Sequence, residues 1–422
     1  MHLTHRQCCR VCGSSALTRV LDLGSQHLQG SFIKPGKELP PMRKVPLELV
    51  RCDPMRDEKA CGLLQMRHST PTEILYSAYW YRSGTNNTMR NHLRGIAEEA
   101  AELRAKAGSC PAGVRVLDIG CNDGTLLGYY PEDFVKFGVD PSDVAQEAKS
   151  ETVTVVQDLF PSAELSERSG GGQFDIITSI AMFYDLEDPV DFVRNIKASL
   201  SKDGLWVFEM SYMPTMLAKN SYDTICHEHL EYYSLAVIEN ILRRANMKVF
   251  HASLNSSNGG SIRCYATHDD CFSYKERSQT LVELRQSEFD LALDTDKPYR
   301  DFEDRIQEHR DELRTLIKRL KQEGKSIHIY GASTKGNTIL QYCDIDHSLI
   351  DCAADRNPEK HGARTLGTNI PIVSEAESRA MKPDYYLVLP WHFKAEFVER
   401  EKATREAGTK MIFPLPSIEV ID

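Results

Sequence analysis

The stretch Val116–Leu127, "VLDIGCNDGTLL", decides the fold class of the largest segment of the chain. It has the pattern of an apolar strand that ends in Asp118, then a turn with Gly120 and Gly124 that opens a helix. Because glycine has no side chain, the backbone of such a turn can approach a ligand closely at the carboxyl edge of a parallel sheet. The spacing departs from the G-x-G-x-x-G pattern of dinucleotide-binding turns. The stretch therefore predicts a cofactor-binding turn, against the alternative that its glycines only shape a tight turn.

Strand-like and helix-like runs alternate around this turn, from Val114 to about Thr267. The strand-like runs are "VRVLDIG", "FVKFGVD", "VTVVQD", "FDIITSI", "GLWVFEM", "MKVFHASL" and "SIRCYAT". This alternation predicts a doubly wound parallel sheet that is completed by a hairpin. Asp140 ends the second run, a position from which a carboxylate reaches the hydroxyl groups of a ribose.

A second alternating block begins at Ser326, with strand-like runs in "SIHIYGAS", "LIDCAADR", "IPIVS" and "DYYLVLP". A charged amphipathic helix from about Tyr299 to Glu323 is predicted to connect the two blocks. The chain as a whole is therefore expected to be α/β, with a small N-terminal domain, the large sheet and a second Rossmann-like sheet. The predicted domains span residues 1–70, 71–298 and 299–422.

The first turn of the second sheet, in "YGASTKGNTIL", is a candidate anion site. Ser333, Thr334 and Lys335 stand where backbone amides at a helix start attract negative charge, so a diphosphate is the expected ligand. Trp391 and His392 in "VLPWHF" lie at another carboxyl edge of the same sheet. We expect the diphosphate between this domain and the middle one, because ligand sites favour domain interfaces. The alternative is a purely structural sheet.

Four cysteines near the N-terminus have a spacing that suits a metal. Cys9 and Cys12 form C-x-x-C in "CRVCGS", and Cys52 and Cys61 follow about forty residues later. Two pairs of thiolates can close a tetrahedral zinc site, which is structural because no position stays open. A segment this short also needs such a link to be stable. Cys8 is a spare candidate, and four free thiols are the alternative.

Composition narrows the function further. The 422 residues are 41% hydrophobic and 27% charged, with a formal net charge of −10, so a surface that binds nucleic acid is not expected. The N-terminus "MHLTHRQCCRVCGS" has no apolar signal region, and no window is apolar enough to span a bilayer. We expect a cytoplasmic protein with reduced thiols, a small-molecule substrate, no membrane partner, and a monomeric or small homo-oligomeric state.

The stretch "ICHEHLEYYS", residues 225–234, holds two histidines that flank a glutamate. His227 and His229 are only two residues apart, whereas helical metalloprotease ligands are four apart and share one helix face. An unperturbed histidine side chain has a pKa of about 6.5 and can accept a proton at neutral pH. The stretch is therefore a candidate acid/base site.

Several motifs together carry a resemblance to a known family. The "VLDIGCNDGTLL" turn resembles the first motif of class I S-adenosylmethionine methyltransferases. With the N-terminal cysteines, "HEHLEYYS", "NGGSIR" and "YGASTKGNTIL", nearly the whole chain resembles the sugar-nucleotide C-methyltransferases of deoxysugar biosynthesis. The resemblance implies S-adenosylmethionine as cofactor, a structural zinc ion, and methyl transfer to carbon-3 of a nucleoside diphosphate 4-keto-6-deoxyhexose.

The resemblance also assigns roles to residues. His229 is the expected base, with Glu228 beside it, and a tyrosine in "AYWYRSGTN" stabilises the enolate, where we favour Tyr81 over Tyr79. The expected cofactor contacts are Asp118, Gly120, Asn122, Gly124, Asp140 and, on the adenine side, Asp158. The expected substrate contacts are His227, Asp185, Ser333, Thr334, Lys335, Arg356 in the nucleotide-side loop "DRNPEKHG", Trp391 and His392.

Two positions depart from the family pattern. Some relatives have a tyrosine where this chain has Cys226, and a histidine where it has Asp185, and both positions are expected in the sugar pocket. The departures leave the identity of the sugar open. O- or N-methylation of a sugar nucleotide is a second reading of the sequence, and a zinc-stabilised protein that binds a nucleotide or the cofactor without chemistry is a third.

Overall fold

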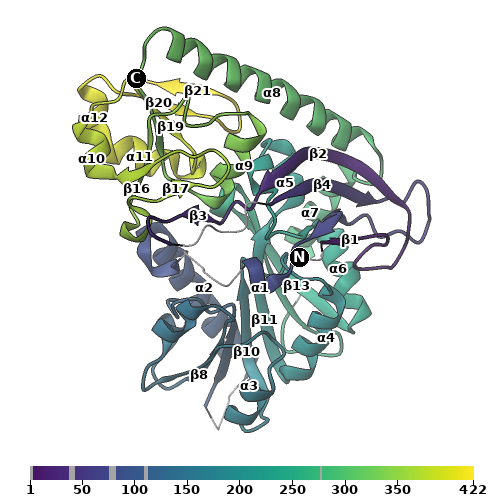
Figure 1. Cartoon of the computed structure of the whole chain (residues 1–422). Helices are drawn as coiled ribbons and strands as arrows, with labels where there is room; N and C mark the ends of the chain where they lie inside the picture. The colour runs from purple at the N-terminus through teal and green to yellow at the C-terminus, as the bar shows by residue number, and fades with distance from the viewer. Residues whose placement is uncertain (1–2, 38–42, 76–81, 109–112, 276–277) are drawn as a thin grey trace.

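The computed structural model describes residues 3–37, 43–75, 82–108, 113–275 and 278–422. Figure 1 shows a large sheet with its helices, a smaller α/β body at the C-terminal end, and N-terminal strands packed against both. The long helix α8, Lys297–Gln322, crosses from one body to the other. No helix among these residues has both the length and the apolar character needed to span a bilayer.

The large sheet has seven strands in the order β13-β14-β11-β10-β7-β8-β9. Its strands are β7 Arg115–Ile119, β8 Val135–Val139, β9 Val153–Val156, β10 Phe174–Ile180, β11 Leu200–Ser211, β13 Met247–Asn255 and β14 Ser261–His268. Five are parallel, and β14 runs antiparallel between β11 and β13. This is the doubly wound class I methyltransferase sheet with a terminal hairpin, so the predicted fold class is confirmed.

Alternate residues of these strands pack on opposite faces. Val116 and Ile176 pack with α2, Asn87–Ala107, on one face. Leu117 and Ile177 belong to the core on the other face. That core includes residues of α4 Pro189–Ser199, α6 Leu235–Arg244 and α7 Ser278–Asp290. Because both faces are covered, the strands are apolar throughout, which made them recognisable.

The glycine-rich turn differs from the expectation in one respect. It opens a short 3-10 helix, Leu127–Tyr129, and not an α-helix. Only ten residues separate Gly124 from the start of β8 at Val135, and Pro131 lies among them. An α-helix has no room to form there, because proline lacks the amide donor and clashes with the preceding turn.

The N-terminal strands are joined to both of the other bodies. The strands are β1 Thr4–His5, β2 Leu17–His27, β3 Phe32–Ile33, β4 Lys44–Cys52, β5 Leu64–Met66 and β6 His68–Ser69. One sheet has the order β12-β5-β4-β2, and its strand β12, Glu231–Tyr232, comes from the "HEHLEYYS" stretch. On the other side, β3 pairs with β17, Arg364–Thr365, of the C-terminal body. The N-terminal domain therefore fixes the candidate acid/base stretch.

The C-terminal body is a six-stranded sheet in the order β18-β16-β15-β19-β20-β21. Its strands are β15 Ile327–Tyr330, β16 Cys352–Asp355, β18 Ile372–Ser374, β19 Tyr385–Val388, β20 Lys410–Phe413 and β21 Glu419–Ile421. Its helices are α9 Thr334–Tyr342, α10 Glu375–Ala380, α11 Lys394–Arg400 and α12 Lys402–Glu406. The first five strands are parallel, which confirms the Rossmann-like second sheet.

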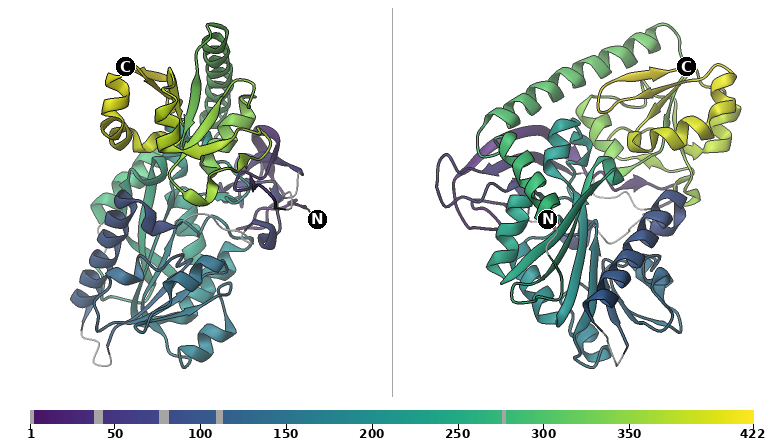
Figure 2. Two further views of the ribbon diagram at one scale, coloured as in Figure 1. Left: turned by 60° about the vertical axis from the view of Figure 1, so that its left-hand side comes forward. Right: turned by 180° about the vertical axis from the view of Figure 1, so that it is seen from behind.

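Helix α8 ties this body to the N-terminal sheet. Phe302, Ile306, Leu313, Ile317 and Leu320, which the periodicity predicts on one face, are all buried. They share a core with strands of the C-terminal sheet and with β2. The views in Figure 2 show α8 reaching over the N-terminal strands to the C-terminal body.

Candidate active site

A cavity of about 550 Å³ lies where the three bodies meet. Its wall contains residues of the glycine-rich turn, the "HEHLEYYS" stretch, the segment Gly30–Phe32 and the first turn of α9. The volume is within the range of small-molecule sites, which is about 300–1,000 Å³. One space thus joins the predicted cofactor turn to the C-terminal body.

The cofactor end of the cavity is built around the turn after β7. Asp118, Gly120, Asn122, Asp140 and Asp158 all line it. Asn122 donates its backbone N–H to the carboxylate of Asp140 at 2.9 Å, which fixes that side chain at the end of β8. Gly120 has a φ of +73°, and a side chain there would meet Met182 at 3.2 Å. These residues fit S-adenosylmethionine, whose ribose suits a carboxylate beside a glycine turn.

Asp118 lines the cavity, whereas Gly124 shapes the turn from outside the cavity wall. Burial raises the pKa of Asp118 to about 7, and a hydrogen bond of 2.5 Å from the Thr178 hydroxyl opposes the rise. A cation bound next to Asp118 therefore favours its ionised form. Gly124 does not line the cavity, but it has a φ of +74°, and a Cβ there would lie 2.6 Å from Cβ of Ala148. Its role is to shape the turn.

The residues that follow Tyr81 in the "AYWYRSGTN" stretch contact the cofactor turn, which the sequence did not predict. Ser83 donates its N–H to the side chain of Asn122 at 3.0 Å, and Gly84 donates its N–H to Asp123 at 2.7 Å. Tyr79 and Tyr81 lie outside the described residues. The neighbouring residues Arg82, Ser83 and Thr85 line the cavity.

Among the residues that the structure describes, His229 has hydrogen-bond partners on one ring nitrogen and none on the other. Its Nδ1–H donates to the carbonyl oxygen of Thr224 at 2.7 Å, so Nε2 keeps its lone pair. The ring packs against Tyr184, with centroids 4.2 Å apart, and the residue lines the cavity. Burial, together with the charge of Lys335, lowers the pKa of His229 to about 3. The imidazole is therefore neutral and able to accept a proton throughout the physiological pH range.

Glu228, the adjacent residue, has its pKa shifted in the opposite direction. Burial raises the pKa of its carboxyl group to about 7, against the effect of the Lys335 charge. The carboxylate approaches the N-terminal domain so closely that a Cβ on Gly30 would lie 2.6 Å from Oε1. Neighbouring groups whose pKa values are pushed apart in one cavity are typical of acid/base sites.

Two predicted substrate contacts lie elsewhere. His227 does not line the cavity; its Nδ1 lies 2.5 Å from Oε1 of Gln29 and its Nε2 lies 3.1 Å from the carbonyl oxygen of Val45. Trp391 also lies outside the wall, and its indole N–H donates to Asp223, which does line the cavity, at 2.9 Å. Both side chains are engaged by the protein, so we do not assign them to the substrate. They hold the loop around His229 in place.

The other predicted substrate residues do line the cavity, namely Asp185, Ser333, Thr334, Lys335, Arg356 and His392. Ser333 caps α9, since its hydroxyl accepts the N–H of Gly336 at 3.0 Å. Nδ1 of His392 is buried and has no hydrogen-bond partner among the described residues. A hydrogen-bonding ligand would satisfy it.

The sequence did not predict that a histidine and a glutamate would pair in this wall. His92 on α2 and Glu209 on β11 both line the cavity, with Nε2 of His92 2.6 Å from Glu209. Arg263 and Asn255 donate to the other carboxylate oxygen at 2.8 and 2.9 Å. The available signal was Glu209 itself, a charged residue inside the apolar run "LWVFEM". The hairpin that carries "NGGSIR" thus supports a histidine and carboxylate pair.

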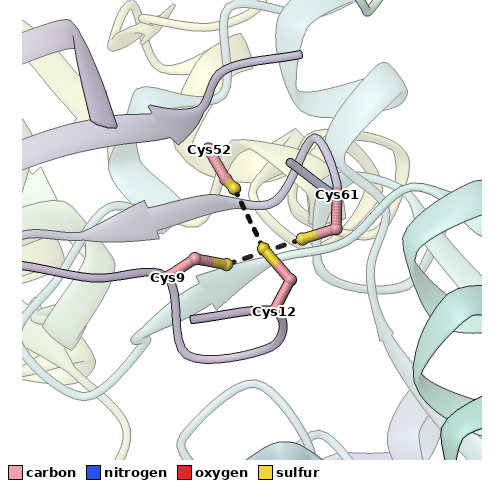
Figure 3. A group of neighbouring side chains, drawn as sticks. All are labelled: Cys9, Cys12, Cys52 and Cys61. Carbon is pink, nitrogen blue, oxygen red and sulfur yellow. Dashed lines mark hydrogen bonds between the residues drawn. The ribbon is translucent and has the colours of Figure 1, made fainter. Parts of the chain in front are cut away.

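The four predicted zinc ligands meet in one cluster (Figure 3). The sulfur atoms of Cys9, Cys12, Cys52 and Cys61 all lie within 4.8 Å of one another. Zinc–sulfur bonds of about 2.3 Å in a tetrahedron require sulfur separations of about 3.8 Å, so the donor set fits zinc. None of the four lines the cavity, which agrees with a structural role, and Cys8 is exposed outside the cluster.

Comparisons with known proteins cover most of the chain. Family models match residues 9–76 as a zinc-binding domain, 89–252 as a methyltransferase domain and 256–416 as a C-methyltransferase C-terminal domain. The C-methyltransferase NovU of Streptomyces niveus is 28% identical over 418 residues, which are 98% of this chain and 96% of that protein. The chain is an S-adenosylmethionine-dependent C-methyltransferase.

More distant similarities are confined to part of this C-methyltransferase. A tRNA U34 carboxymethyltransferase of Campylobacter jejuni is 26% identical over 148 residues, which are 32% of this chain and 50% of that protein. An S-adenosylmethionine-dependent methyltransferase structure from Clostridium acetobutylicum is 13% identical, with a TM-score of 0.33, and the match covers 44% of this chain and 93% of that one.

These findings decide between the readings of the sequence. The matches support C-methylation over O- or N-methylation. They also argue against a protein that binds a nucleotide or the cofactor without catalysing a reaction. The cofactors of the C-methyltransferase are S-adenosylmethionine and a structural zinc ion, as predicted.

Proposed function

We propose that this C-methyltransferase methylates carbon-3 of a nucleoside diphosphate 4-keto-deoxysugar and so makes a branched-chain deoxysugar. The observation that carries the proposal is the fixed tautomer of His229, which leaves Nε2 without a hydrogen bond to the described residues. His229 lines a cavity that joins the cofactor turn to the C-terminal body. Forming a carbon–carbon bond requires a base that removes a proton next to a ketone, and this imidazole meets that requirement.

S-adenosylmethionine, when bound, supplies a methyl group on a cationic sulfur. The residues of the chain create the nucleophile. Nε2 of His229 takes the proton from carbon-3, and the carboxylate of Glu228 stabilises the imidazolium that forms. Tyr81, or else Tyr79, donates a hydrogen bond toward the ketone oxygen. Because Glu228 and His229 are both buried in the cavity wall, their charges act where water screens them little.

We propose that the chain divides into domains 1–70, 71–298 and 299–422. The C-terminal domain is proposed to hold the nucleotide. Ser333 and Thr334 stand at the start of α9, where backbone amides attract a diphosphate. Arg356 and His392 supply further donors from the same wall. Asp185 and Cys226, which depart from the pattern of relatives, both line the cavity and are proposed to select the sugar.

The proposal is tested by incubating the protein with S-adenosylmethionine and a panel of thymidine, cytidine and guanosine diphospho-4-ketosugars. We expect one of them to gain a single methyl group by mass spectrometry. Nuclear magnetic resonance should then place the new carbon–carbon bond at carbon-3. Methylation on oxygen or nitrogen, or no methylation of any ketosugar, would contradict the proposal.

A further inference from the structure

Lys335 stands at the point where the C-terminal body meets the candidate acid/base stretch. It lies in the first turn of α9 and lines the cavity. One turn later, the hydroxyl of Thr338 donates to the carbonyl oxygen of Ile225 at 3.1 Å, and Asn337 donates to the carbonyl oxygen of Gln29 at 2.9 Å. These bonds fix the start of α9 against the loop that carries Glu228 and His229.

The side chain of Lys335 is buried, which lowers its pKa, and the charges of Asp223 and Glu228 oppose this decrease and favour the ammonium form. Among the described residues it makes no salt bridge, and its contact is with the carbonyl oxygen of Asn258 at 3.5 Å. Lys360, another lysine in the wall, is engaged instead: its ammonium donates to Ala332 at 2.8 Å and lies 3.3 Å from Asp355. Asp223 and Glu228 thus stabilise the Lys335 charge without a salt bridge among the described residues, so its ammonium group can still contact a ligand in the cavity.

The charge of Lys335 acts on the groups around the predicted chemistry. Burial lowers the pKa of His229 and of His392, and the Lys335 charge lowers both further. Burial raises the pKa of Glu228 and of Asp223, and the same charge opposes both rises. The ammonium group therefore lies among the acid/base residues, and not only at the anion-binding end of α9.

We propose that Lys335 is a catalytic residue whose ammonium group stabilises the enolate oxygen of the bound ketosugar, and that the substrate diphosphate is not its ligand. This inference rests on the proposed function. The sequence led us to expect the diphosphate at Lys335, because the residue follows a helix start. The structure instead places Lys335 in the same cavity wall as Glu228 and His229.

Proton removal and methyl transfer conserve atoms and electrons. The bond between carbon-3 and its hydrogen breaks, and the proton goes to Nε2 of His229. The electron pair forms the double bond between carbon-3 and carbon-4, and the carbonyl pair moves to the oxygen that faces Lys335. When carbon-3 bonds to the methyl group, the ketone is restored, the electrons of the former carbon–sulfur bond stay on sulfur, and the proton leaves His229 for water.

Proton removal next to a ketone requires a group that stabilises the enolate, because the negative charge develops on the ketone oxygen. An imidazole that binds protons weakly is a weak base, so it can remove a proton from carbon only if the resulting enolate is strongly stabilised. A preformed positive charge supplies that stabilisation where the negative charge develops. Lys335, which lies in the same cavity wall as His229, can supply this charge to the enolate oxygen.

The test compares Lys335→Met, Lys335→Arg and Lys335→Ala with a matched control, Lys219→Met. Lys219 donates to the carbonyl oxygen of Gly259 at 3.0 Å, next to Asn258, but it does not line the cavity. One readout is the exchange of the carbon-3 hydrogen with heavy water, without methyl donor, in the ketosugar that the wild type methylates. The other is the affinity for the corresponding nucleoside diphosphate without sugar.

We expect Lys335→Met to slow exchange and methyl transfer by about 100-fold to 1,000-fold, the cost of losing one oxyanion donor. Its affinity for the nucleoside diphosphate should stay that of the wild type, as should all properties of Lys219→Met. Lys335→Arg should keep part of the activity, and added ethylamine should restore exchange in Lys335→Ala. Rescue in that variant separates loss of the charge from loss of the fold.

Two results would distinguish failure of this inference from failure of the proposed function. If Lys335→Met keeps wild-type exchange but loses affinity for the nucleoside diphosphate, the lysine is a diphosphate ligand and the inference is wrong. If the wild type itself exchanges no hydrogen in any ketosugar of the panel, the proposed function fails instead.

Discussion

The carbonyl oxygen of Thr224 lies 2.7 Å from Nδ1 of His229, five residues further along the chain. A carbonyl oxygen can only accept a hydrogen bond, so the imidazole proton must be on Nδ1. The other nitrogen, Nε2, is then the only basic atom that His229 can offer. A hydrogen bond to the backbone thus decides which nitrogen of His229 can act as the base.

Replacing His229 with alanine should abolish proton removal from the ketosugar. We expect exchange of the carbon-3 hydrogen and methyl transfer to fall by about 100-fold to 10,000-fold, the typical contribution of a positioned base. Affinity for S-adenosylmethionine, measured by calorimetry, should hardly change, because the cofactor residues are on other elements. His268→Ala, which removes a histidine outside the cavity, serves as control. Wild-type exchange in His229→Ala would refute the assignment.

The pH dependence of methyl transfer should report Glu228. Its pKa is raised to about 7 by burial, so the carboxylate that stabilises the imidazolium is present above pH 7 and is lost as pH falls through 7. His229, with a pKa lowered to about 3, stays in its basic form over the same range. We therefore expect kcat/KM to rise with pH through about 7. Glu228→Gln should remove this limb, and its survival in the variant would assign the limb to another group.

The strands of both large sheets could be predicted because burial on both faces makes them continuous apolar runs. The cofactor turn was recognisable for a similar reason, since Asp118, Gly120 and Asp140 lie at fixed points of one local motif. These features depend on residues that are close in sequence or on a repeated strand and helix pattern. Both can be recognised in a single sequence.

The rest of the site depends on contacts between distant residues that leave little trace in the sequence. His92 and Glu209 meet from a helix and a strand 117 residues apart. The strand β12 has only two residues, too few for any periodicity, yet it joins the acid/base stretch to the N-terminal sheet. Lys335 could be assigned to a helix start from sequence, but the group that its charge faces depends on how α9 docks.

Zinc removal should affect chemistry through this sheet. Cys52 ends β4, and β4 pairs with β5, which in turn pairs with β12, two residues after His229. We expect one zinc ion per chain by elemental analysis of the wild type, and a loss of zinc, solubility and methyl transfer in Cys12→Ser. Cys8→Ser, which changes an exposed thiol outside the cluster, should keep all three. A folded, active and zinc-free Cys12→Ser protein would contradict the zinc assignment.

Glu209 should contribute strongly to stability. Its side chain is 4% exposed and pairs with Arg263, which is 11% exposed. Removing one member of a buried pair leaves the other charge uncompensated, so Glu209→Ala should lower the free energy of unfolding by about 3–5 kcal/mol in urea titrations. In the control Glu102→Ala, the lost partner is Lys106 in a pair that is 66% exposed on both sides, and the change should stay below about 1 kcal/mol. Equal effects would show that the Glu209 network is not buried in solution.

Replacing Gly30, in the N-terminal domain, with alanine should displace the carboxylate of Glu228. A Cβ at this position would lie 2.6 Å from Oε1 of Glu228, closer than any normal contact, so the carboxylate must move. We expect Gly30→Ala to lower kcat and to shift the pH limb near 7, while zinc content and cofactor affinity stay unchanged. Gly95→Ala, on α2 with no atom within 4 Å of the new Cβ, is the matched control and should be active. If Gly30→Ala retains the wild-type pH profile and rate, the N-terminal domain does not position Glu228.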